Sequence, residues 1–374
     1  MSNRLVEPGK TIGILGGGQL GRMMALSARE MGFKIAVLEP QENSPCGQIA
    51  DVEVVANYND LQGAQKLAAE CDVLTYEFEN IDRKTARWLD ENLFLPQGYK
   101  LLETTQHRIS EKEAILKLGL PVAPYVSVNE LVDLEQGIRD LGLPAVLKTC
   151  RGGYDGKGQY VIKERDQIQE AFELLKPSGE LVLEQWITFE KELSVIVSRN
   201  VRGQAETFPV AENIHVNNIL HQSIVPARID EGVQGKAKEM ALRLASGLDM
   251  VGTLAVEMFY TSEGTLYINE LAPRPHNSGH YTINACETSQ FEQHIRAICN
   301  WPLGKTKLLK PVVMVNILGE HLPQVMQKID QFQEMKLHLY GKAEAKKGRK
   351  MGHINIVANS TEEALEKVNA LEIW

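Results

Sequence analysis

The sequence predicts a mixed α/β and α+β protein, with an N-terminal doubly wound parallel-sheet domain and a small C-terminal α+β module. Three observations support this fold class. Apolar runs alternate with helical patterns over residues 11–96, a glycine-rich loop separates two apolar runs at residues 148–159, and strand and helix patterns recur over residues 312–371. Alternation of the first kind is typical of a parallel sheet with helices on both faces.

Composition narrows the class of protein. The 374 residues suggest two or three domains, and 43% of them are hydrophobic and 24% charged, as in ordinary globular proteins. The formal net charge of −9 argues against nucleic acid as the main partner. Five scattered cysteines without a C-x-x-C pair predict reduced thiols, a cytoplasmic location and no zinc site. The N-terminus has no apolar signal region, and no apolar run is long enough for a membrane span.

The first domain is predicted over residues 1–105. A buried strand at residues 11–16 leads into Gly16-Gly17-Gly18-Gln19-Leu20-Gly21 and a helix, and a second strand ends at Glu39. This satisfies the dinucleotide-binding pattern G-x-G-x-x-G with an acidic residue about 20 positions later, so a nicotinamide-dependent dehydrogenase is one hypothesis. A helix N-terminus at this turn would also bind other anions.

The same domain continues with a second candidate binding position. Glu77, in Tyr76-Glu77-Phe78-Glu79, follows a predicted strand, and the carboxyl ends of parallel strands form the ligand crevice. Glu77 could accept hydrogen bonds from a substrate amine or hydroxyl, or it could be a solvated loop residue. Strands are expected at residues 52–55, 72–76 and 93–96, and helices at residues 61–70 and 83–92.

The second domain, residues 106–300, is expected to begin with a helix at residues 106–117 and to contain a mobile small lobe at about residues 122–188. Within that lobe, the stretch KTCRGGYDGKGQ begins at Lys148. Its glycines let the backbone approach a ligand closely, and Lys148 and Lys157 add positive charge, so it is predicted to hold phosphate as a lid between two antiparallel strands. It is not a P-loop, because a strand follows it. A glycine-rich hairpin with solvated lysines is the alternative.

Two acidic positions follow the loop. Glu184, with the apolar Trp186 and Ile187, could form a purine slot whose acceptors face an exocyclic amine, and Glu192 could bind ribose hydroxyls. Solvated acids at a strand end are the alternative explanation. His215 is most simply a hydrogen-bonded loop histidine.

Two further carboxylates lie on a predicted hairpin of residues 253–260 and 265–270. A two-residue loop would pair Glu257 directly with Glu270, whereas a four-residue loop would leave them diagonal on the same face. Like charges in apolar strands are costly to bury, so we predict a Mg²⁺ ion between them, with an edge strand in water as the alternative. The next loop has an oxyanion-binding composition: Arg274, His276, Asn277 and Ser278.

The C-terminal module is predicted over residues 301–374. Its basic run, residues 346–350, is either a solvated loop or a clamp for a substrate phosphate. Strands are expected at residues 312–318, 336–340 and 353–357, and helices at residues 324–332 and 362–371.

The order of these motifs resembles the ATP-grasp superfamily, in which two α+β lobes hold ATP. The sequence is most similar to the family of synthetases that carboxylate 5-aminoimidazole ribonucleotide in de novo purine synthesis. That resemblance implies a ligase that uses ATP, magnesium, for which manganese could substitute, and bicarbonate, and that works through carboxyphosphate. It rests on GGGQLGRM, YEFEN, GGYDGKGQ, EQWITFEKELSVI, NELAPRPHNSGH and RKMGHIN, spread over residues 16–355.

The resemblance also implies roles for individual residues. Catalytic roles would fall to Arg274, His276, Asp155 and Glu77, with Asp155 or Glu77 as proton acceptor, and the metal would bind Glu257 and Glu270. The substrate would be held by Gln19, Leu20, Glu77, Asp155, Arg274, Asn277, Ser278, Lys347, Arg349 and Lys350. ATP would contact Arg108, Lys148, Gly153, Tyr154, Asp155, Gly156, Lys157, Gly158, Gln159, Glu184, Gln185, Trp186, Ile187, Glu192, His215, Asn269 and Glu270.

Other functions would use only some of these sequence motifs. A formate-using glycinamide ribonucleotide transformylase or a biotin carboxylase would use the same two lobes with another acceptor. A dehydrogenase would leave the glycine loop and the carboxylate pair without a role, and a non-catalytic nucleotide sensor would bind ATP without turnover. The expected partners are small-molecule substrates, without nucleic acid or membrane, and a symmetric homodimer is expected for an enzyme of this kind.

Overall fold

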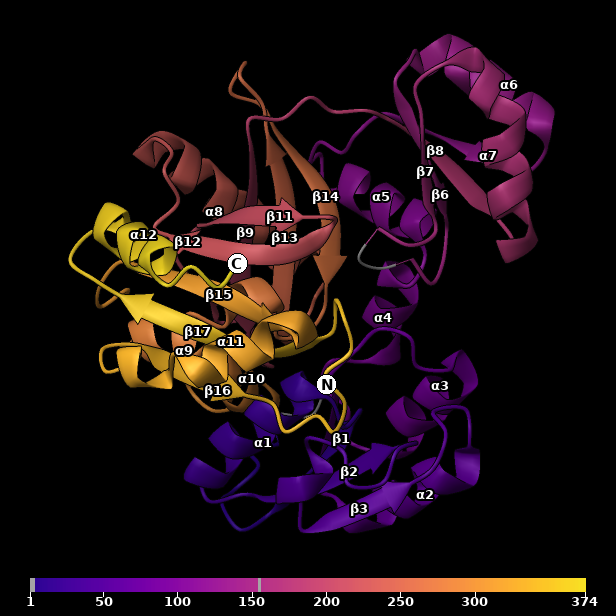
Figure 1. Ribbon diagram of the computed structural model, residues 1–374. Helices are drawn as coiled ribbons and strands as arrows, with labels where there is room; N and C mark the ends of the chain where they lie inside the picture. Colours follow the sequence, from indigo (N-terminus) through magenta and orange to yellow (C-terminus); the bar gives the residue numbers. More distant parts are fainter. Residues whose placement is uncertain (1–3, 154–155) are drawn as a thin grey trace.

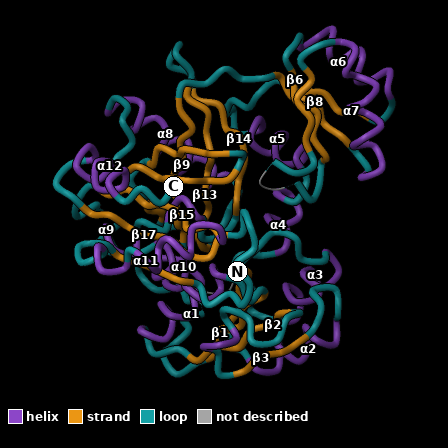
Figure 2. Tube along the Cα trace, in the orientation of Figure 1, coloured by secondary structure: helices purple, strands orange, loops and turns teal. Residues whose placement is uncertain are grey.

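The computed structural model describes residues 4–153 and 156–374 and builds them around three sheets. Figure 1 shows an N-terminal α/β body at the bottom, a small lobe at the upper right and a large antiparallel sheet that the C-terminal strands extend. Figure 2, in the same orientation, shows the helices packed outside these sheets. The mixed α/β and α+β class predicted from the sequence is confirmed.

The N-terminal body is a parallel sheet with strand order β3-β2-β1-β4, which confirms the predicted doubly wound domain. The strand expected at residues 93–96 is wrong. Phe94 O accepts one backbone hydrogen bond, from Leu74 N at 2.9 Å, but Pro96 lacks an N–H group and the chain turns at Gly98. The elements are β1 (Thr11–Leu15), α1 (Gln19–Glu30), β2 (Lys34–Glu39), β3 (Val52–Val55), α2 (Leu61–Glu70), β4 (Val73–Tyr76) and α3 (Arg83–Asn92).

Two helices connect this body to the small lobe, where the sequence predicted one. They are α4 (Tyr99–Thr105) and α5 (Arg108–Lys117), and Gln106 and His107 separate them. His107 has extended backbone and its Nδ1 accepts from Ser110 N at 3.4 Å, so it caps α5 and prevents a continuous helix.

The small lobe is a sheet of order β5-β8-β6-β7 with two helices packed on it. Strands β6 and β7 are antiparallel and place Lys148 opposite Gln159, so the glycine loop does connect two antiparallel strands, as predicted. The elements are β5 (Tyr125–Val128), α6 (Leu131–Leu141), β6 (Ala145–Thr149), β7 (Gln159–Ile162), α7 (Ile168–Leu175) and β8 (Leu181–Gln185).

The large sheet has the order β14-β13-β9-β11-β12-β15-β17-β16, with β10 paired to β9. The C-terminal strands therefore continue the central sheet through the pairing of β12 with β15. Its strands are β9 (Lys191–Arg199), β10 (Ala205–Thr207), β11 (Ala211–Val216), β12 (Ile219–Val225), β13 (Gly252–Tyr260), β14 (Leu266–Ala272), β15 (Val312–Leu318), β16 (Lys336–Leu339) and β17 (Lys350–Val357). The helices are α8 (Glu231–Gly247), α9 (Thr282–Ala285), α10 (Gln290–Ile298), α11 (Leu322–Gln327) and α12 (Thr361–Ala370).

A buried histidine joins the parallel sheet to the large sheet. His294 on α10 is fully buried, accepts from Thr253 N at 3.1 Å through Nδ1, and lies 2.7 Å from Thr75 Oγ1 through Nε2. Burial lowers the pKa of His294 to about 3, because the charged imidazolium would lose its hydration. The folded protein therefore holds a neutral His294 under conditions where the unfolded chain takes up a proton.

We expect acid to destabilise the protein partly through His294. Because its pKa is lowered on folding, its contribution is intact above the unfolded pKa of about 6.5 and declines as the pH falls toward about 3, by up to about 1.4 kcal/mol per pH unit. Urea unfolding of the parent and of His294→Gln at several pH values measures this. The parent should lose more stability than the variant on acidification, and a pH-independent difference between them would contradict the prediction.

Candidate functional site

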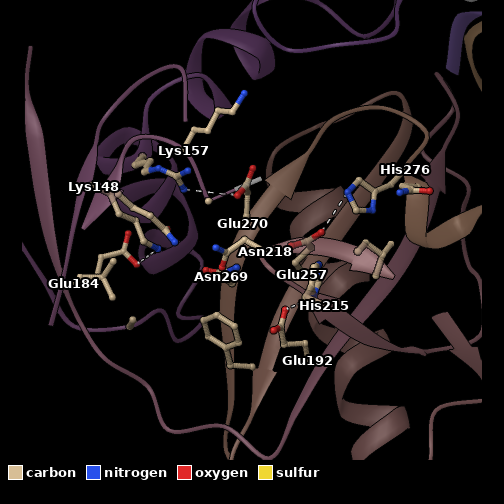
Figure 3. A pocket seen from close by; sticks show the side chains of 18 of the residues that line it. Lys148, Lys157, Glu184, Glu192, His215, Asn218, Glu257, Asn269, Glu270 and His276 are labelled. Carbon is tan, nitrogen blue, oxygen red and sulfur yellow. Dashed lines mark hydrogen bonds and ion pairs between the residues drawn. The ribbon is translucent and has the colours of Figure 1, made fainter. Parts of the chain in front are cut away.

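A cleft of about 570 Å³ lies between the small lobe and the large sheet (Figure 3). Strands β6 and β8 contribute from one side, β13 and β14 from the other, and the first residues of α1 contribute at one end. The structure thus brings together residues that are dispersed from Gln19 to Lys350 in the sequence.

Most of the site residues predicted from the sequence line this cleft. Tyr154 and Asp155 lie outside the described residues. Gly153, Gly158, Ser278, Lys347 and Arg349 are described but do not line it. The lining includes Gln19, Leu20, Glu77, Arg108, Lys148, Gly156, Lys157, Gln159, Glu184, Gln185, Trp186, Ile187, Glu192, His215, Glu257, Asn269, Glu270, Arg274, His276, Asn277 and Lys350.

Glu184 is held by two lysines. Its Oε2 lies 2.9 Å from Lys148 Nζ and its Oε1 lies 3.2 Å from Lys112 Nζ, all three side chains being largely buried. Burial alone would raise the pKa of Glu184, but the two ammonium groups outweigh burial and lower it to about 2. The purine-slot hypothesis assumed free acceptors on Glu184, whereas the structure engages both carboxylate oxygens with lysines.

Sequence reasoning missed Lys112. It lies one turn after Arg108 on α5, so the two side chains share a helix face, and that spacing was the available signal. Lys112 is only 2% exposed and its Nζ lies 5.8 Å from the ring centre of Tyr125. Its contact with Glu184 makes it a positioning residue for the lysine-bearing strand.

Replacing Lys112 with alanine should destabilise the protein by about 3–5 kcal/mol, because one oxygen of the buried Glu184 loses its partner. Denaturant unfolding measures the effect. Lys117→Ala, at the exposed end of the same helix, is the matched control and should change stability by less than about 0.5 kcal/mol. Equal effects of the two substitutions would show that Lys112 has no special contribution.

The wall opposite the lysines is aromatic and carries a second ion pair. Phe189 and Phe259, both missed from sequence, stack with ring centres 4.7 Å apart. His215 Nδ1 lies 2.9 Å from Glu192 Oε2, and although burial lowers the pKa of His215, the Glu192 carboxylate outweighs burial and raises it. The prediction that His215 lies in a loop is wrong. His215 lies on β11, and its side chain faces the cleft.

The two carboxylates of the hairpin face each other because of a β-bulge. Tyr260 pairs with Leu266 and Met258 with Ile268, so a regular ladder would place Asn269 opposite Glu257. The register shifts after Met258, and Glu257 pairs with Glu270 instead. In a bulge two residues oppose one, so Asn269 and Glu270 both face the cleft. The prediction of two carboxylates on one face is confirmed, although neither predicted loop length occurs.

This pairing has an electrostatic consequence. Burial, and after it the charge of Glu270, raises the pKa of Glu257 to about 7. Positive and donor groups offset part of the repulsion: Glu270 Oε2 lies 3.6 Å from Arg108 Nη1, and Glu257 Oε1 lies 3.2 Å from His276 Nε2. A divalent cation would relieve the rest, so the donor set matches the oxygen ligands that Mg²⁺ prefers.

The loop after β14 presents hydrogen-bonding groups that lack partners among the described residues. Arg274 Nη2 lies 2.8 Å from Glu79 Oε1, but its buried Nε has no hydrogen-bond partner there, and neither polar atom of the Asn277 side chain has one. Unsatisfied buried polar groups are costly, and both residues line the cleft, so they are suited to a bound polar ligand. Ser278 is fully buried, and its Oγ lies 2.9 Å from His276 Nδ1, so it orients His276.

The backbone amides of the glycine turn are hydrogen-bonded to carboxylates of the protein itself. The Glu77 carboxylate accepts hydrogen bonds from Gly18 N and, at 2.5 Å, from Gly21 N. A Cβ atom on Gly18 would lie 2.5 Å from Glu77 Oε1, so glycine is needed for this approach. Gly17 N donates to Glu39 Oε2 at 2.7 Å. Because both acids are used internally, the helix N-terminus is not open to a pyrophosphate, which counts against the dehydrogenase hypothesis.

A basic group stands beside Glu77. Burial, with the neighbouring charges of Arg349 and Lys350, lowers the pKa of Lys342 to about 8, while Glu77 opposes the shift. Lys342 Nζ also donates to Lys350 O at 2.8 Å. Sequence reasoning missed Lys342 because it precedes the basic run by a few residues. Lys350 lines the cleft and Lys342 does not, so the two lysines add positive charge at and behind this end of the cleft.

Among the described residues, the helices are too short or too polar for a transmembrane segment.

Comparisons with known proteins identify relatives over the full length of the chain. Family models match at residues 9–106 (ribonucleotide synthetase preATP-grasp domain), 113–291 (ATP-grasp domain) and 312–367 (phosphoribosylaminoimidazole carboxylase C-terminal domain). N5-carboxyaminoimidazole ribonucleotide synthase of Bacillus subtilis is 57% identical, over 98% of this chain and 97% of that protein.

Solved structures agree with these relatives. An ADP complex of N5-carboxyaminoimidazole ribonucleotide synthetase superposes with a TM-score of 0.97 at 60% identity, covering 100% of this chain and 99% of that one. The Aspergillus clavatus synthase in complex with ADP and 5-aminoimidazole ribonucleotide superposes with a TM-score of 0.91 at 32% identity, covering 97% of each chain.

Proposed function

The chain belongs to the N5-carboxyaminoimidazole ribonucleotide synthase family, ATP-grasp ligases of purine biosynthesis, and from this premise we propose how its cleft distributes nucleotide, metal, bicarbonate and ribonucleotide. The contacts around the cleft support a division into four subsites.

The nucleotide lies between the small lobe and the aromatic wall. Lys148 and Arg108 meet its phosphates, because both are cationic and line the cleft, and Arg108 lies 3.6 Å from Glu270 of the carboxylate pair. Trp186 and Phe259 flank the base with apolar surface, and Glu192, held by His215, accepts from the ribose hydroxyls. Phosphoryl transfer depends on positioning and charge neutralisation, which these residues supply.

Glu257 and Glu270 hold the magnesium ion. Burial, and after it the charge of Glu270, raises the pKa of Glu257, and this supports the assignment, since a cation between the carboxylates would stabilise their ionised forms. When bound, Mg²⁺ neutralises charge on the nucleotide phosphates. His276 orients Glu257 through its Nε2, and Arg108 does the same for Glu270.

Bicarbonate is placed by Arg274 beside the γ-phosphate. Attack of a bicarbonate oxygen on phosphorus forms carboxyphosphate and releases ADP, and carboxyphosphate then yields carbon dioxide and phosphate. The Nε of Arg274 and the side chain of Asn277 support this placement, because these buried groups have no hydrogen-bond partner among the described residues and could bind a polar ligand. The side chains of Arg274, Glu257 and His276 are only 15–23% exposed, which limits loss of the labile intermediate to water.

The ribonucleotide lies at the end near the glycine turn. Gln19, Glu77 and Lys350 line this end, and we place the aminoimidazole against Glu77 and the ribonucleotide phosphate against the basic side. Glu77 or Asp155 accepts a proton from the amine as its nitrogen bonds to carbon dioxide. Ser278, Lys347 and Arg349 would reach the substrate only indirectly or after a movement of the C-terminal loop.

ADP formation tests this function. We expect release of ADP to require bicarbonate and to rise strongly with 5-aminoimidazole ribonucleotide, and to stay at the basal level with glycinamide ribonucleotide or biotin. Incorporation of labelled bicarbonate into the ribonucleotide identifies the product. ATP binding without bicarbonate-dependent turnover would instead indicate a nucleotide sensor.

We further propose a cytoplasmic location and a homodimer, and small molecules as the substrates. All five cysteines carry free thiols, which supports a reducing compartment. Light scattering of the purified protein tests the dimer, and a mass of one chain at working concentration would contradict it.

A further inference from the structure

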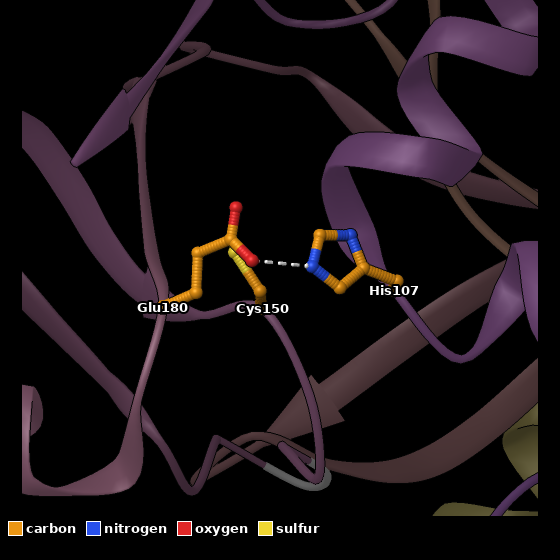
Figure 4. Close-up of side chains that lie close together, drawn as sticks. All are labelled: His107, Cys150 and Glu180. Carbon is orange, nitrogen blue, oxygen red and sulfur yellow. Dashed lines mark hydrogen bonds and ion pairs between the residues drawn. The ribbon is translucent and has the colours of Figure 1, made fainter. Parts of the chain in front are cut away.

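Three side chains with metal-binding donor atoms converge where α5 meets the small lobe (Figure 4). They are His107, which precedes α5, Cys150, which follows β6, and Glu180, which precedes β8. One imidazole nitrogen, the sulfur and one carboxylate oxygen all lie within 4.8 Å of one another. None of the three residues lines the nucleotide cleft, so the cluster is separate from Glu257 and Glu270.

The backbone holds these residues together. Arg108 N donates to Cys150 O at 3.0 Å, and Cys150 N donates to Glu180 O at 2.9 Å. These hydrogen bonds hold together three segments that are distant in the sequence. The convergence is therefore built into the junction between α5 and the small lobe.

We propose that His107, Cys150 and Glu180 form a three-ligand site for one Zn²⁺ ion, with water in the fourth position. Imidazole, thiolate and carboxylate are the three ligand types that Zn²⁺ takes in proteins, and three protein ligands with an open position are common. A thiolate and a carboxylate together balance the two charges of the ion. Mg²⁺ is disfavoured because it prefers oxygen ligands in an octahedral arrangement.

The geometry requires only a small adjustment. Ligand atoms around a tetrahedral Zn²⁺ ion lie roughly 3.3–3.6 Å apart, given bond lengths of about 2.0–2.3 Å. His107 Nε2 and Glu180 Oε2 are 2.9 Å apart, and no pair in the cluster exceeds 4.8 Å. Rotations of side chains that change these separations by about 1 Å would place all three donors on one ion.

Metal binding requires a change of protonation at two of the three ligands. In this structure Nδ1 of His107 accepts from Ser110 N at 3.4 Å, so the ring proton lies on Nε2. Binding of the ion to Nε2 would move that proton to Nδ1, and Ser110 Oγ, 3.3 Å from Nδ1, can accept it. Burial raises the pKa of the Cys150 thiol to about 12, and the charge of Glu180 adds to this, so the metal must displace a proton. The side chain of Glu180 is 45% exposed and gives the ion a path from solvent.

This site departs from the expectation, based on cysteine spacing, that the protein has no zinc site. Each donor comes from a different segment, so no short motif announces the cluster. Bound metal would link the segment before α5 to two segments of the small lobe. Because only the folded chain presents the three donors together, the ion would also raise the melting temperature.

Cobalt titration of the full-length protein tests the proposal. One equivalent of Co²⁺ should produce a thiolate-to-cobalt charge-transfer band, which Zn²⁺ removes and excess Mg²⁺ leaves in place. Cys150→Ser should abolish the band, and His107→Gln and the exposed Glu180→Gln should weaken Co²⁺ affinity by at least about 10–100-fold. Cys286→Ser, another buried thiol, is the matched control and should keep the band.

A second readout guards against misfolding of the Cys150 variant. Zn²⁺ should raise the melting temperature of the parent and of Cys286→Ser, but not of Glu180→Gln at the same concentration. Absence of the band in the parent, or its persistence in Cys150→Ser, would overturn the proposal. If Glu180→Gln binds Co²⁺ as tightly as the parent, the assignment of Glu180 as the third ligand is wrong.

Discussion

Replacing Glu270 with glutamine is expected to lower kcat by at least about 100-fold, because the substitution removes one of the two carboxylates that face each other across β13 and β14. Glutamine keeps the size of the side chain but not its charge, so the proposed magnesium site would lose affinity. Steady-state ADP formation as a function of Mg²⁺ concentration measures the loss and separates weaker metal binding from a lower maximal rate.

Glu263→Gln is the matched control for this experiment. Glu263 lies on the exposed turn of the same hairpin and contacts Ser262 Oγ, away from the cleft. Its turnover should equal that of the parent. Near-parent turnover of Glu270→Gln at saturating Mg²⁺ would remove Glu270 from the metal site. The pKa of Glu257 adds a further check: loss of the Glu270 charge should lower it, because that charge is one cause of its rise.

Replacing Arg274 with alanine is expected to lower bicarbonate-dependent ATP cleavage by about 10²–10³-fold. Arg274 lines the cleft next to the carboxylate pair and has a buried Nε without a hydrogen-bond partner among the described residues. Loss of the guanidinium would remove the donors that hold bicarbonate and stabilise developing charge on the transferred group. Phosphate release with and without bicarbonate measures the effect.

Two comparisons make the Arg274 result specific. Arg274→Lys keeps the charge but loses the planar pair of donors, so it should recover only part of the activity. Arg83→Ala, which removes a half-exposed arginine paired to Glu103, should leave turnover unchanged. ADP affinity should also stay within a few-fold of the parent in Arg274→Ala. If phosphate release continues at the parent rate, Arg274 does not hold bicarbonate or carboxyphosphate.

The hairpin shows how far local sequence could go. Two acids in otherwise apolar strands predicted a shared face, and that prediction is confirmed. The register, however, depends on a bulge at Asn269, which no turn motif near Ser262 announces. Without it Glu270 would face away from Glu257, because side chains alternate along a strand. The sequence argument assumed a regular ladder between the two strands. The two carboxylates share a face only because the bulge shifts that ladder by one residue.

The glycine turn shows the opposite case. Its spacing matched a dinucleotide-binding motif, and only the fold reveals that Glu77 accepts from the amides at the helix N-terminus. Phe189 was missed for a related reason, since an aromatic wall has no local signature until its partner is known. The spacing of Lys112 from Arg108 was a local signal, but it did not indicate Glu184 as the partner of Lys112. In each case the deciding contact joins residues that are far apart in the chain.

By itself, the sequence determined the order of strands and helices, the glycine loop and the residue types of the site, because hydrophobic periodicity and turn chemistry act over a few residues. The tertiary structure alone decided which carboxylates are paired and which are held by lysines. It also brought the side chains of His107, Cys150 and Glu180 close together. Charge and hydrogen bonding act through space, so the protonation and availability of a side chain follow from neighbours that the linear order does not specify.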